Sequence, residues 1–528
     1  MSSTRQSFTP VCALDDVLPN GGACALVEGR QIAIFRVDEE LFALDNFDPA
    51  SAANVLSRGI VGDLEGERVV ASPLYKHHYC LATGRCLEDA SQSVNVYPVR
   101  VMDGRVWVDT QPQRRSSARR RRLVVIGNGM AGMRTVEELL ELAPEAYEIT
   151  VLGAETRVNY NRILLSPVLA GEKRAEDIIL HPPQWYAEHR VALHMGDPVV
   201  EIDRRRRLVR SRSGRETPYD RLLIATGATA IVLPIPGAQL PGVVTFRDLD
   251  DVEAMLEQAR RCRRAAVIGG GLLGLEAAVG LARRGLDVTV VHLLDTLMER
   301  QLDAAAGQLL KSALETRGLR FRMQTQTVAV KGMQRAEGLQ FEDGSELETD
   351  LVVMAAGIRP NIELAYAAGL RCERGILVDD TMQTYDPSIY AVGECVQHRS
   401  RTFGLVAPLW EQARVCGAHL AEIGVRRYRG TICAARLKVS GIDLYSAGDF
   451  SGAGGGEALV LRDPRRRIYK RLVIRDDRLC GAVLYGDARH GEWYLELMTA
   501  GENVAPLRDQ LLFGPSAASG AGSIATVD

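Results

Sequence analysis

The sequence predicts an α/β protein in which two Rossmann-like domains of one strand–turn–helix type are nested, the second inserted into the first. A glycine-rich turn at residues 127–132 follows the apolar run 123–126, and a turn of the same kind at 269–274 follows 265–268. Glycine permits the tight turn and lets backbone approach a pyrophosphate, and the helix that follows presents free N–H groups to the anion. One such turn is weak evidence, whereas two in matching contexts predict two bound dinucleotides, most economically FAD and a visiting NADH or NADPH.

Residues around these turns are the candidates for cofactor binding. For FAD they are Gly127, Gly129, Gly132, Glu155, Arg162, Thr226, Gly227, Gly393 and Glu394, and for the nicotinamide coenzyme they are Gly269, Gly271, Gly274 and Gly357. Glu155 lies just past the second strand, where an acid can accept hydrogen bonds from ribose hydroxyls. Arg162 could pair with a diphosphate through two N–H groups. An exposed turn glutamate and a surface arginine are the alternatives for these two positions.

The second unit departs from the usual dinucleotide pattern at the end of its second strand. An acid normally grips the adenosine ribose there, but this chain has His292 after the run 288–291. No basic clamp for a 2′-phosphate is evident either, so the choice between NADH and NADPH stays open. His292 as a simple strand cap is the alternative interpretation.

Composition bounds the class of protein. A chain of 528 residues exceeds a single core and predicts several domains. A net charge of −3 argues against general nucleic-acid affinity, and the sequence has neither a secretion signal nor an apolar run that could span a membrane, so we expect a cytoplasmic protein. Its ten cysteines show none of the common metal-binding spacings, and no metal site is expected.

Changes in pattern along the chain predict the domain boundaries. They are a β-rich domain at 1–112, an arginine-rich linker at 113–122, the FAD domain at 123–240 and 359–430, the nicotinamide domain at 241–358, an α/β domain at 431–514 and a disordered tail at 515–528. The linker is expected to be a solvated tether, with a docking strip for an acidic partner as the alternative.

From residue 123 to 514 the chain resembles the flavin half of the large subunit of assimilatory NAD(P)H nitrite reductases, in the pyridine nucleotide-disulfide oxidoreductase superfamily. The segments that carry the resemblance are 158–172, 297–303 and 407–413. It implies that Glu394 contacts the FAD ribityl chain, that Glu276 faces the nicotinamide and that Trp410 lies near the isoalloxazine, the last two being the catalytic candidates. A helix-start acid and a core tryptophan are the alternatives. Related reductases commonly have a lysine where this chain has Pro167.

The N-terminal region resembles the small subunit of the same nitrite reductases, which is a Rieske-like domain. The segments that carry this resemblance are 11–16, 44–49, 55–59 and 71–75. A Rieske cluster needs two cysteines and two histidines, but neither residue type occurs between Cys24 and His77. Ser72 and Tyr75 stand where the second pair of ligands would be. We therefore predict an all-β Rieske-like fold kept for docking or stability, without iron.

Together these observations predict an FAD-dependent NAD(P)H oxidoreductase that serves as the electron-transfer component of assimilatory nitrite or nitrate reduction. The expected acceptor is a metal centre on a separate partner, either an iron protein of the sirohaem or ferredoxin type or a molybdenum reductase. A homodimer is one option for the oligomeric state. Two alternatives remain: a general ferredoxin or rubredoxin reductase, and a non-catalytic FAD-binding protein that senses redox state.

Overall fold

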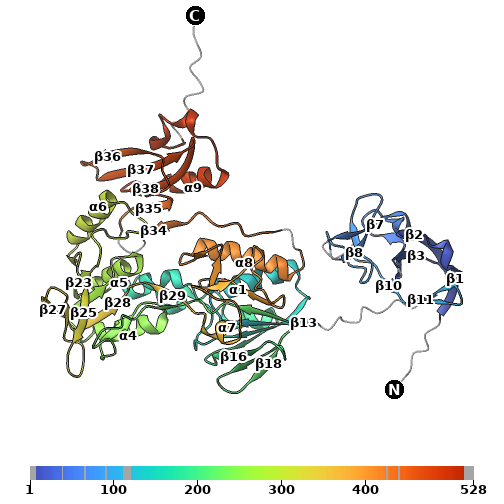
Figure 1. Cartoon of the computed structure of the whole chain (residues 1–528), viewed down its shortest axis with the longest axis horizontal. Coiled ribbons are helices and arrows are strands. Elements are labelled where there is room, and N and C mark those ends of the chain that lie inside the picture. Colours follow the sequence, from blue (N-terminus) through green and yellow to red (C-terminus); the bar gives the residue numbers. More distant parts are fainter. Residues whose placement is uncertain are drawn as a thin grey trace, which may run out of the picture. The chain divides into compact units, whose positions relative to one another are not determined.

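The computed structural model describes residues 8–38, 40–64, 67–89, 92–110, 120–423, 426–437 and 441–515. The chain forms two compact units, residues 1–121 and 122–528, which are described separately (Figure 1). Most of the predicted linker and nearly all of the predicted tail lie outside the described residues. None of the helices in the ranges above combines the length and the apolar character needed to cross a membrane.

The N-terminal unit consists of short, mostly antiparallel sheets. One sheet has the order β10-β4-β3-β2 (Val96–Tyr97, Glu40–Asp45, Arg30–Val37 and Gly21–Val27), another has β1-β12-β11 (Phe8–Ala13, Arg105–Asp109 and Val99–Met102), and a third has β7-β8-β9 (Ile60–Leu64, Glu67–Ala71 and His78–Cys80). The strands β11 and β12 form a tight hairpin, since Met102 pairs with Arg105 and both Asp103 and Gly104 have positive φ, as such a turn requires. Two buried apolar clusters form the core of this unit.

A buried carboxylate joins two loops of the N-terminal unit. Asp48 lies on the short strand β5 (Phe47–Asp48) and is fully buried. Its Oδ2 accepts hydrogen bonds from the hydroxyls of Ser72 (2.5 Å) and Ser51 (2.8 Å), and its Oδ1 accepts from the hydroxyl of Tyr79 (2.6 Å) and the backbone N–H of Ala50 (3.0 Å). Every donor around the carboxylate is thereby satisfied, and the loops that carry Asp48 and Ser72 are linked directly.

The FAD domain of the second unit is built on a five-stranded sheet. Its order is β15-β14-β13-β19-β31 (Val191–His194, Tyr147–Leu152, Arg121–Ile126, Arg221–Ile224 and Ile389–Ala391). The helices α1 (Met130–Leu142) and α8 (Val406–Leu420) pack together against it, and a three-stranded sheet of β16, β17 and β18 (Val199–Asp203, Leu208–Ser211 and Glu216–Pro218) follows β15. Residues 123–126 are buried on both faces, as is typical of a sheet covered by helices.

The nicotinamide domain repeats this plan between β19 and β31. Its sheet has the order β21-β28-β22-β23-β24 (Val243–Thr245, Leu351–Met354, Arg264–Ile268, Asp287–Val291 and Arg320–Arg322), with every neighbouring pair parallel. The associated helices are α4 (Leu249–Ala259), α5 (Leu272–Arg283) and α6 (Ala304–Glu315), and a small sheet joins β25, β26 and β27 (Thr327–Lys331, Gly338–Phe341 and Glu346–Glu348). Because β31 completes the first sheet only after this domain, the predicted nesting of two Rossmann-like domains is confirmed.

A ribbon of two short strands connects the nested domains. The chain leaves the FAD domain through β20 (Ala228–Ala230) and returns through β29 (Ile358–Pro360), and these strands pair antiparallel. Beside the ribbon, the Thr226 hydroxyl donates to the carbonyl of Asn361 and the Asn361 side-chain amide donates to the carbonyl of Thr226, both at 2.9 Å. The two chain segments that pass between the domains are therefore joined to each other by both backbone and side-chain hydrogen bonds.

The C-terminal domain is a five-stranded sheet with one helix. The sheet order is β34-β35-β38-β37-β36 (Ala434–Arg436, Leu444–Gly448, Arg478–Tyr485, Ile468–Arg475 and Glu457–Asp463), and the helix is α9 (Gly491–Ala500). The C-terminal domain shares a buried core with the nicotinamide domain. The Tyr469 hydroxyl donates to Asp303, the residue that caps α6, at 2.5 Å.

We expect Asp48→Asn to loosen the two loops of the N-terminal unit. The amide places an N–H donor among hydroxyl and backbone donors and leaves at least one of them without an acceptor, which costs about 2–3 kcal/mol. Hydrogen exchange of the full chain should show peptides from 46–58 and 71–80 exchanging about 30-fold faster or more. Asp103→Asn is the matched control, because asparagine suits the left-handed turn position of Asp103 (φ 50°). Equal protection in both variants would contradict the role given to Asp48.

The same network predicts a dependence on pH. Burial raises the pKa of Asp48, but hydrogen bonds from Ser72, Tyr79, Ser51 and Ala50 outweigh it and hold this pKa below the ordinary value of 3.8. A depressed carboxyl pKa stabilises the fold above the unfolded value and loses that contribution as the pH falls through the folded value. Protection of the two loops, corrected for intrinsic exchange, should therefore be constant near neutrality and fall below about pH 4. The Asp48→Asn variant should lack this fall.

Candidate functional site

A cavity of about 1000 Å³ in the second unit is lined by both nested domains and by the C-terminal domain. The FAD domain contributes residues 126–131, 225–229 and 392–394, the nicotinamide domain contributes Thr245, Arg247, Asp248, Asp251, Leu272, Leu273 and Glu276, and the C-terminal domain contributes Ala434, Ala435, Arg436, Tyr445 and Glu492. The cavity thus begins at the first glycine turn and reaches the first turns of the helix that follows the second one.

The three glycines of the first motif serve different needs. Gly127 has φ 110°, and a Cβ there would collide with the carbonyl oxygen of Ala225 at the end of β19. Gly132 lies against the same residue, since its Cβ would stand 2.9 Å from the Cβ of Ala225. Gly129 precedes α1 without a side-chain cap, and no atom lies within 4 Å of the position of its Cβ. Two glycines therefore allow close packing at the point where the strand order reverses, and Gly129 leaves open space at the helix N-terminus.

The second motif has the same geometry. Gly269 has φ 126° and lies against the carbonyl of Ala355 at the end of β28, while Gly274 lies against the carbonyl of Gly269. Gly271 precedes α5 and has open space at its Cβ position, as Gly129 does. Gly357, with φ 115°, follows β28. These glycines lie outside the lining of the large cavity, which the motif reaches through Leu272, Leu273 and Glu276.

Glu155 and Arg162 lie together on one wall of the cavity. The Arg162 guanidinium pairs with Glu155, and the Tyr160 hydroxyl donates to the other Glu155 oxygen at 2.7 Å. Arg162 also donates to the carbonyl of Arg247 (3.3 Å). The sequence presented these two residues as separate candidates, whereas the structure joins them in one charged group next to the first glycine turn.

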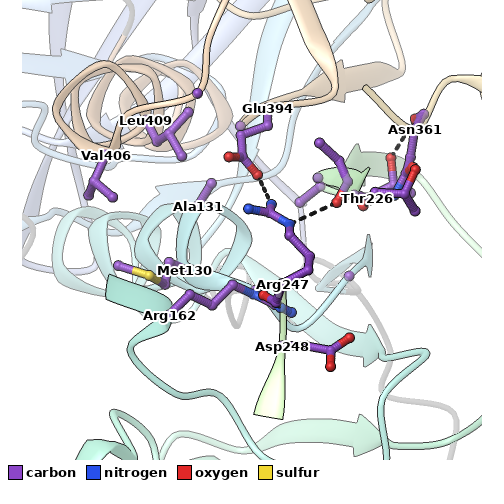
Figure 2. Close-up of a pocket in the computed structure, with 18 of the residues that line it drawn as sticks. Met130, Ala131, Arg162, Thr226, Arg247, Asp248, Asn361, Glu394, Val406 and Leu409 are labelled. Carbon is purple, nitrogen blue, oxygen red and sulfur yellow. Dashed lines mark hydrogen bonds and ion pairs between the residues drawn. The ribbon is translucent and has the colours of Figure 1, made fainter. Parts of the chain in front are cut away.

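Glu394 faces an arginine that the sequence analysis did not single out. The Arg247 guanidinium pairs with Glu394 and donates through Nε to the carbonyl of Ala228 at 3.0 Å (Figure 2). Both side chains are largely buried in the cavity wall. Gly393 has φ 96°, and its N–H donates to the Gln412 side chain at 2.9 Å, which fixes the loop that presents Glu394.

Glu276 is a buried carboxylate on α5 that lines the cavity. The Ser166 hydroxyl of helix α2 (Leu165–Ala170) donates to it, and Pro167 follows within that helix. The structure thus brings Glu276 from the nicotinamide domain against the FAD domain. The polar group next to this carboxylate is therefore the Ser166 hydroxyl.

Trp410 lies in a separate, smaller cavity of about 410 Å³. Met130 lines both cavities, so the tryptophan stands on the other side of that residue from the large cavity. A buried network borders the smaller cavity: the two ring nitrogens of His181 lie 2.8 Å from Asn159 Oδ1 and 2.7 Å from Glu137 Oε1. Trp410 is therefore close to the FAD domain's first helix without lining the large cavity.

Several cavity residues carry no sequence signal of their own. Arg247 and Asp248 come directly before α4, and Asp248 caps that helix by accepting from the N–H of Asp251 (2.9 Å). An Asp ahead of an apolar helical pattern predicts a cap and nothing about a cavity. Asn361 and Arg436 are likewise recognisable only after the fold brings distant segments together.

Three family models match the chain. The Pyridine nucleotide-disulphide oxidoreductase model matches residues 121–418, the Rieske-like 2Fe-2S domain model matches 7–109, and the Rubredoxin NAD+ reductase C-terminal domain model matches 434–502. Because the first match spans more than half of the chain, the protein belongs to the pyridine nucleotide-disulphide oxidoreductase family. This is a family of NAD(P)H-dependent flavin oxidoreductases, the class that the two glycine motifs predicted.

Individual relatives agree with this assignment. A Bacillus subtilis NAD(P)H nitrite reductase is 48% identical over 372 residues, which are 70% of this chain and 46% of that protein. The assimilatory nitrate reductase electron transfer subunit of Bacillus subtilis is 43% identical over 394 residues, which are 75% of this chain and 51% of that protein. The chain spans about half the length of these relatives. A ferredoxin reductase structure from Rhodopseudomonas palustris has a TM-score of 0.65 at 27% identity and covers 70% of this chain and 91% of that one.

The cavity fits FAD, whereas the N-terminal unit does not fit an iron–sulfur cluster. Gly129 and the uncapped start of α1 leave the backbone N–H groups and the space that a diphosphate needs. In the N-terminal unit, Asp48 and Ser72 are directly hydrogen-bonded and Tyr75 is exposed. The segment 46–58 contains neither cysteine nor histidine, so the two loops do not supply the two thiolates and two imidazoles of a Rieske cluster. Within the described residues, no three His, Cys, Asp or Glu side chains are grouped to hold a metal ion.

We expect Gly129→Ala to lower flavin retention without unfolding the protein. The added methyl meets no protein atom within 4 Å, so the fold tolerates it, but it fills space in the cavity at the helix N-terminus. The Kd for FAD should rise at least about tenfold, which corresponds to about 1.4 kcal/mol of binding free energy, so the purified variant should retain less flavin. The far-ultraviolet circular dichroism should match that of the unchanged protein. Gly62→Ala is the control, because Gly62 also has open space and lies in the other unit. Unchanged flavin content in Gly129→Ala would contradict this account of the turn.

Proposed function

We propose that the protein is the electron-transfer component of assimilatory nitrite or nitrate reduction, taking electrons from NADH or NADPH through FAD and passing them to a metal centre on a partner protein. The observation that carries the proposal is the single cavity that runs from the first glycine turn to Glu276 on α5. A site for each dinucleotide opening into one space is the arrangement that electron transfer between them requires. The partner, as an iron or molybdenum reductase, is part of the same proposal.

The names of the relatives support the choice of acceptor. Two relatives, at 48% and 43% identity, are a nitrite reductase and a nitrate reductase electron transfer subunit. Both are about twice as long as the part that matches, so the activity of the whole relative is not carried over. We assign the acceptance of reducing equivalents to the two nested domains and the C-terminal domain of this chain.

The residues of the cavity suggest a division of roles. A bound flavin supplies the capacity to take two electrons from a nicotinamide and to release them one at a time. The N-terminus of α1 and Gly129 would hold the diphosphate, and Glu155 would accept hydrogen bonds from the ribose. Glu394, paired with Arg247, would accept a hydrogen bond from a hydroxyl of the flavin side chain. Buried Glu276 would orient the nicotinamide, and Trp410 would support the flavin domain from the neighbouring cavity.

A rubredoxin- or ferredoxin-type acceptor is the second candidate. The specific observation in its favour is the match of residues 434–502 to the Rubredoxin NAD+ reductase C-terminal domain. This domain forms one wall of the cavity through Arg436, Tyr445 and Glu492, so it lies where it can affect how electrons leave. The two candidates share the same reductive half and differ only in the protein that receives the electrons.

Reduction followed by a comparison of acceptors tests the proposal. Under anaerobic conditions, NADH or NADPH should bleach the yellow purified protein at a rate fast enough for turnover, about 1 s⁻¹ or more. The reduced protein should then be reoxidised by a sirohaem nitrite reductase or a molybdenum nitrate reductase faster than by a rubredoxin or a plant-type ferredoxin.

Three results would count against it. Protein that stays colourless when FAD is added would remove the enzyme function altogether. Bleaching with preferred reoxidation by rubredoxin would select the second candidate. Bound FAD without turnover, even with ferricyanide, would favour a redox-sensing protein.

A further inference from the structure

Both ring nitrogens of His292, at the end of β23, have hydrogen-bond partners in the protein backbone. Gly270 donates its N–H to His292 Nδ1 at 3.0 Å, and His292 Nε2 lies 3.0 Å from the carbonyl oxygen of Thr296. A carbonyl can only accept, so Nε2 carries the hydrogen and Nδ1 is the acceptor. The buried ring is therefore neutral, and neither nitrogen is left to receive a ribose hydroxyl or to face a phosphate.

The segment after His292 folds back onto the second glycine turn. Met298 has φ 52° and donates its N–H to the carbonyl of Gly270 at 2.9 Å. A Cβ on Gly270 would stand 2.7 Å from the His292 ring and 2.7 Å from Leu297, so only glycine fits between them. The next residue, Glu299, is thereby held beside the turn that faces the dinucleotide.

Glu299 presents a carboxylate with unused capacity. Its Oε2 is buried and has no hydrogen-bond partner among the described residues, and it lies 3.5 Å from His292 Nε2. The side chain as a whole is 32% exposed, so a ligand can reach its atoms other than Oε2. A carboxylate held beside the turn in this way can accept hydrogen bonds from the hydroxyls of a ligand.

The surroundings do not favour a 2′-phosphate. The neighbouring strand β24 carries two arginines, and Arg320 lies 3.8 Å from Asp287. Arg322 pairs with Val291, and its guanidinium donates to Ser345 (3.0 Å) and to the carbonyl of Glu346 (3.4 Å). Those bonds hold the cation against a different hairpin. The two residues after His292, Leu293 and Leu294, are apolar and exposed. A phosphate dianion placed here would meet the charge of Glu299 and an apolar rim.

We propose that Glu299 replaces the missing strand-end acid, accepts hydrogen bonds from the adenosine-ribose hydroxyls and makes the site select NADH over NADPH. This inference rests on the proposed function only in that a nicotinamide coenzyme binds at the second glycine motif. Glu299 is then a specificity-determining residue seven positions beyond the place where the usual acid stands.

Ligand binding to the FAD-loaded full-length protein tests the proposal without electron transfer. Calorimetric titration with ADP-ribose and with 2′-phospho-ADP-ribose should show ADP-ribose binding at least about tenfold more tightly, the size of one charged hydrogen bond. In Glu299→Gln the loss of charge should weaken ADP-ribose binding about five- to tenfold and bring the two affinities close together. Glu315→Gln, which removes an exposed charge on α6 of the same domain, should keep the preference of the unchanged protein.

Two outcomes would overturn the proposal. The first is an unchanged preference in Glu299→Gln, provided that its flavin content and circular dichroism match the control. The second is tighter binding of 2′-phospho-ADP-ribose by the unchanged protein, abolished by Arg300→Gln, which would give the neighbouring arginine the decisive role. Failure of the proposed function would look different, because the ligand preference would persist while the acceptor proteins stayed oxidised.

Discussion

The ribbon between β20 and β29 is the constraint on which the rest of the second unit depends. It joins the two points where the chain crosses between the nested domains, and the paired amide and hydroxyl bonds of Thr226 and Asn361 lie beside it. Because the two connecting segments are paired with each other, they form one two-stranded connection between the sheets. The cavity is lined by both of the domains that this connection joins, and Glu276 of one domain accepts a hydrogen bond from Ser166 of the other.

The sequence alone predicted the parts of this arrangement that have a local cause. Gly127 and Gly269 are recognisable because a tight turn behind a buried strand requires glycine at a fixed spacing, and the nested order of the domains follows from the alternation of strands and helices. Arg247 and Asn361 could not be predicted, because their contacts join residues that are far apart in the sequence. Arg247 meets Glu394 across 147 positions and Asn361 meets Thr226 across 135, so no local pattern records either pairing.

The strand-end histidine shows a different kind of limit. The sequence shows His292 where an acid usually ends the second strand, and one interpretation of this histidine was a simple strand cap. The structure shows the ring bonded to Gly270 and Thr296, which requires the path of the whole segment 292–298. A departure from a motif can thus be seen in the sequence, whereas the group that compensates for it depends on how the following loop folds.

The Asp48 carboxylate of the N-terminal unit has a consequence for how this domain folds. Asp48 links the two loops by accepting hydrogen bonds from three side-chain hydroxyls and one backbone N–H of the chain. The link between the two loops is thus made by groups of the polypeptide itself, so it forms as the domain folds and does not wait for a ligand to bind.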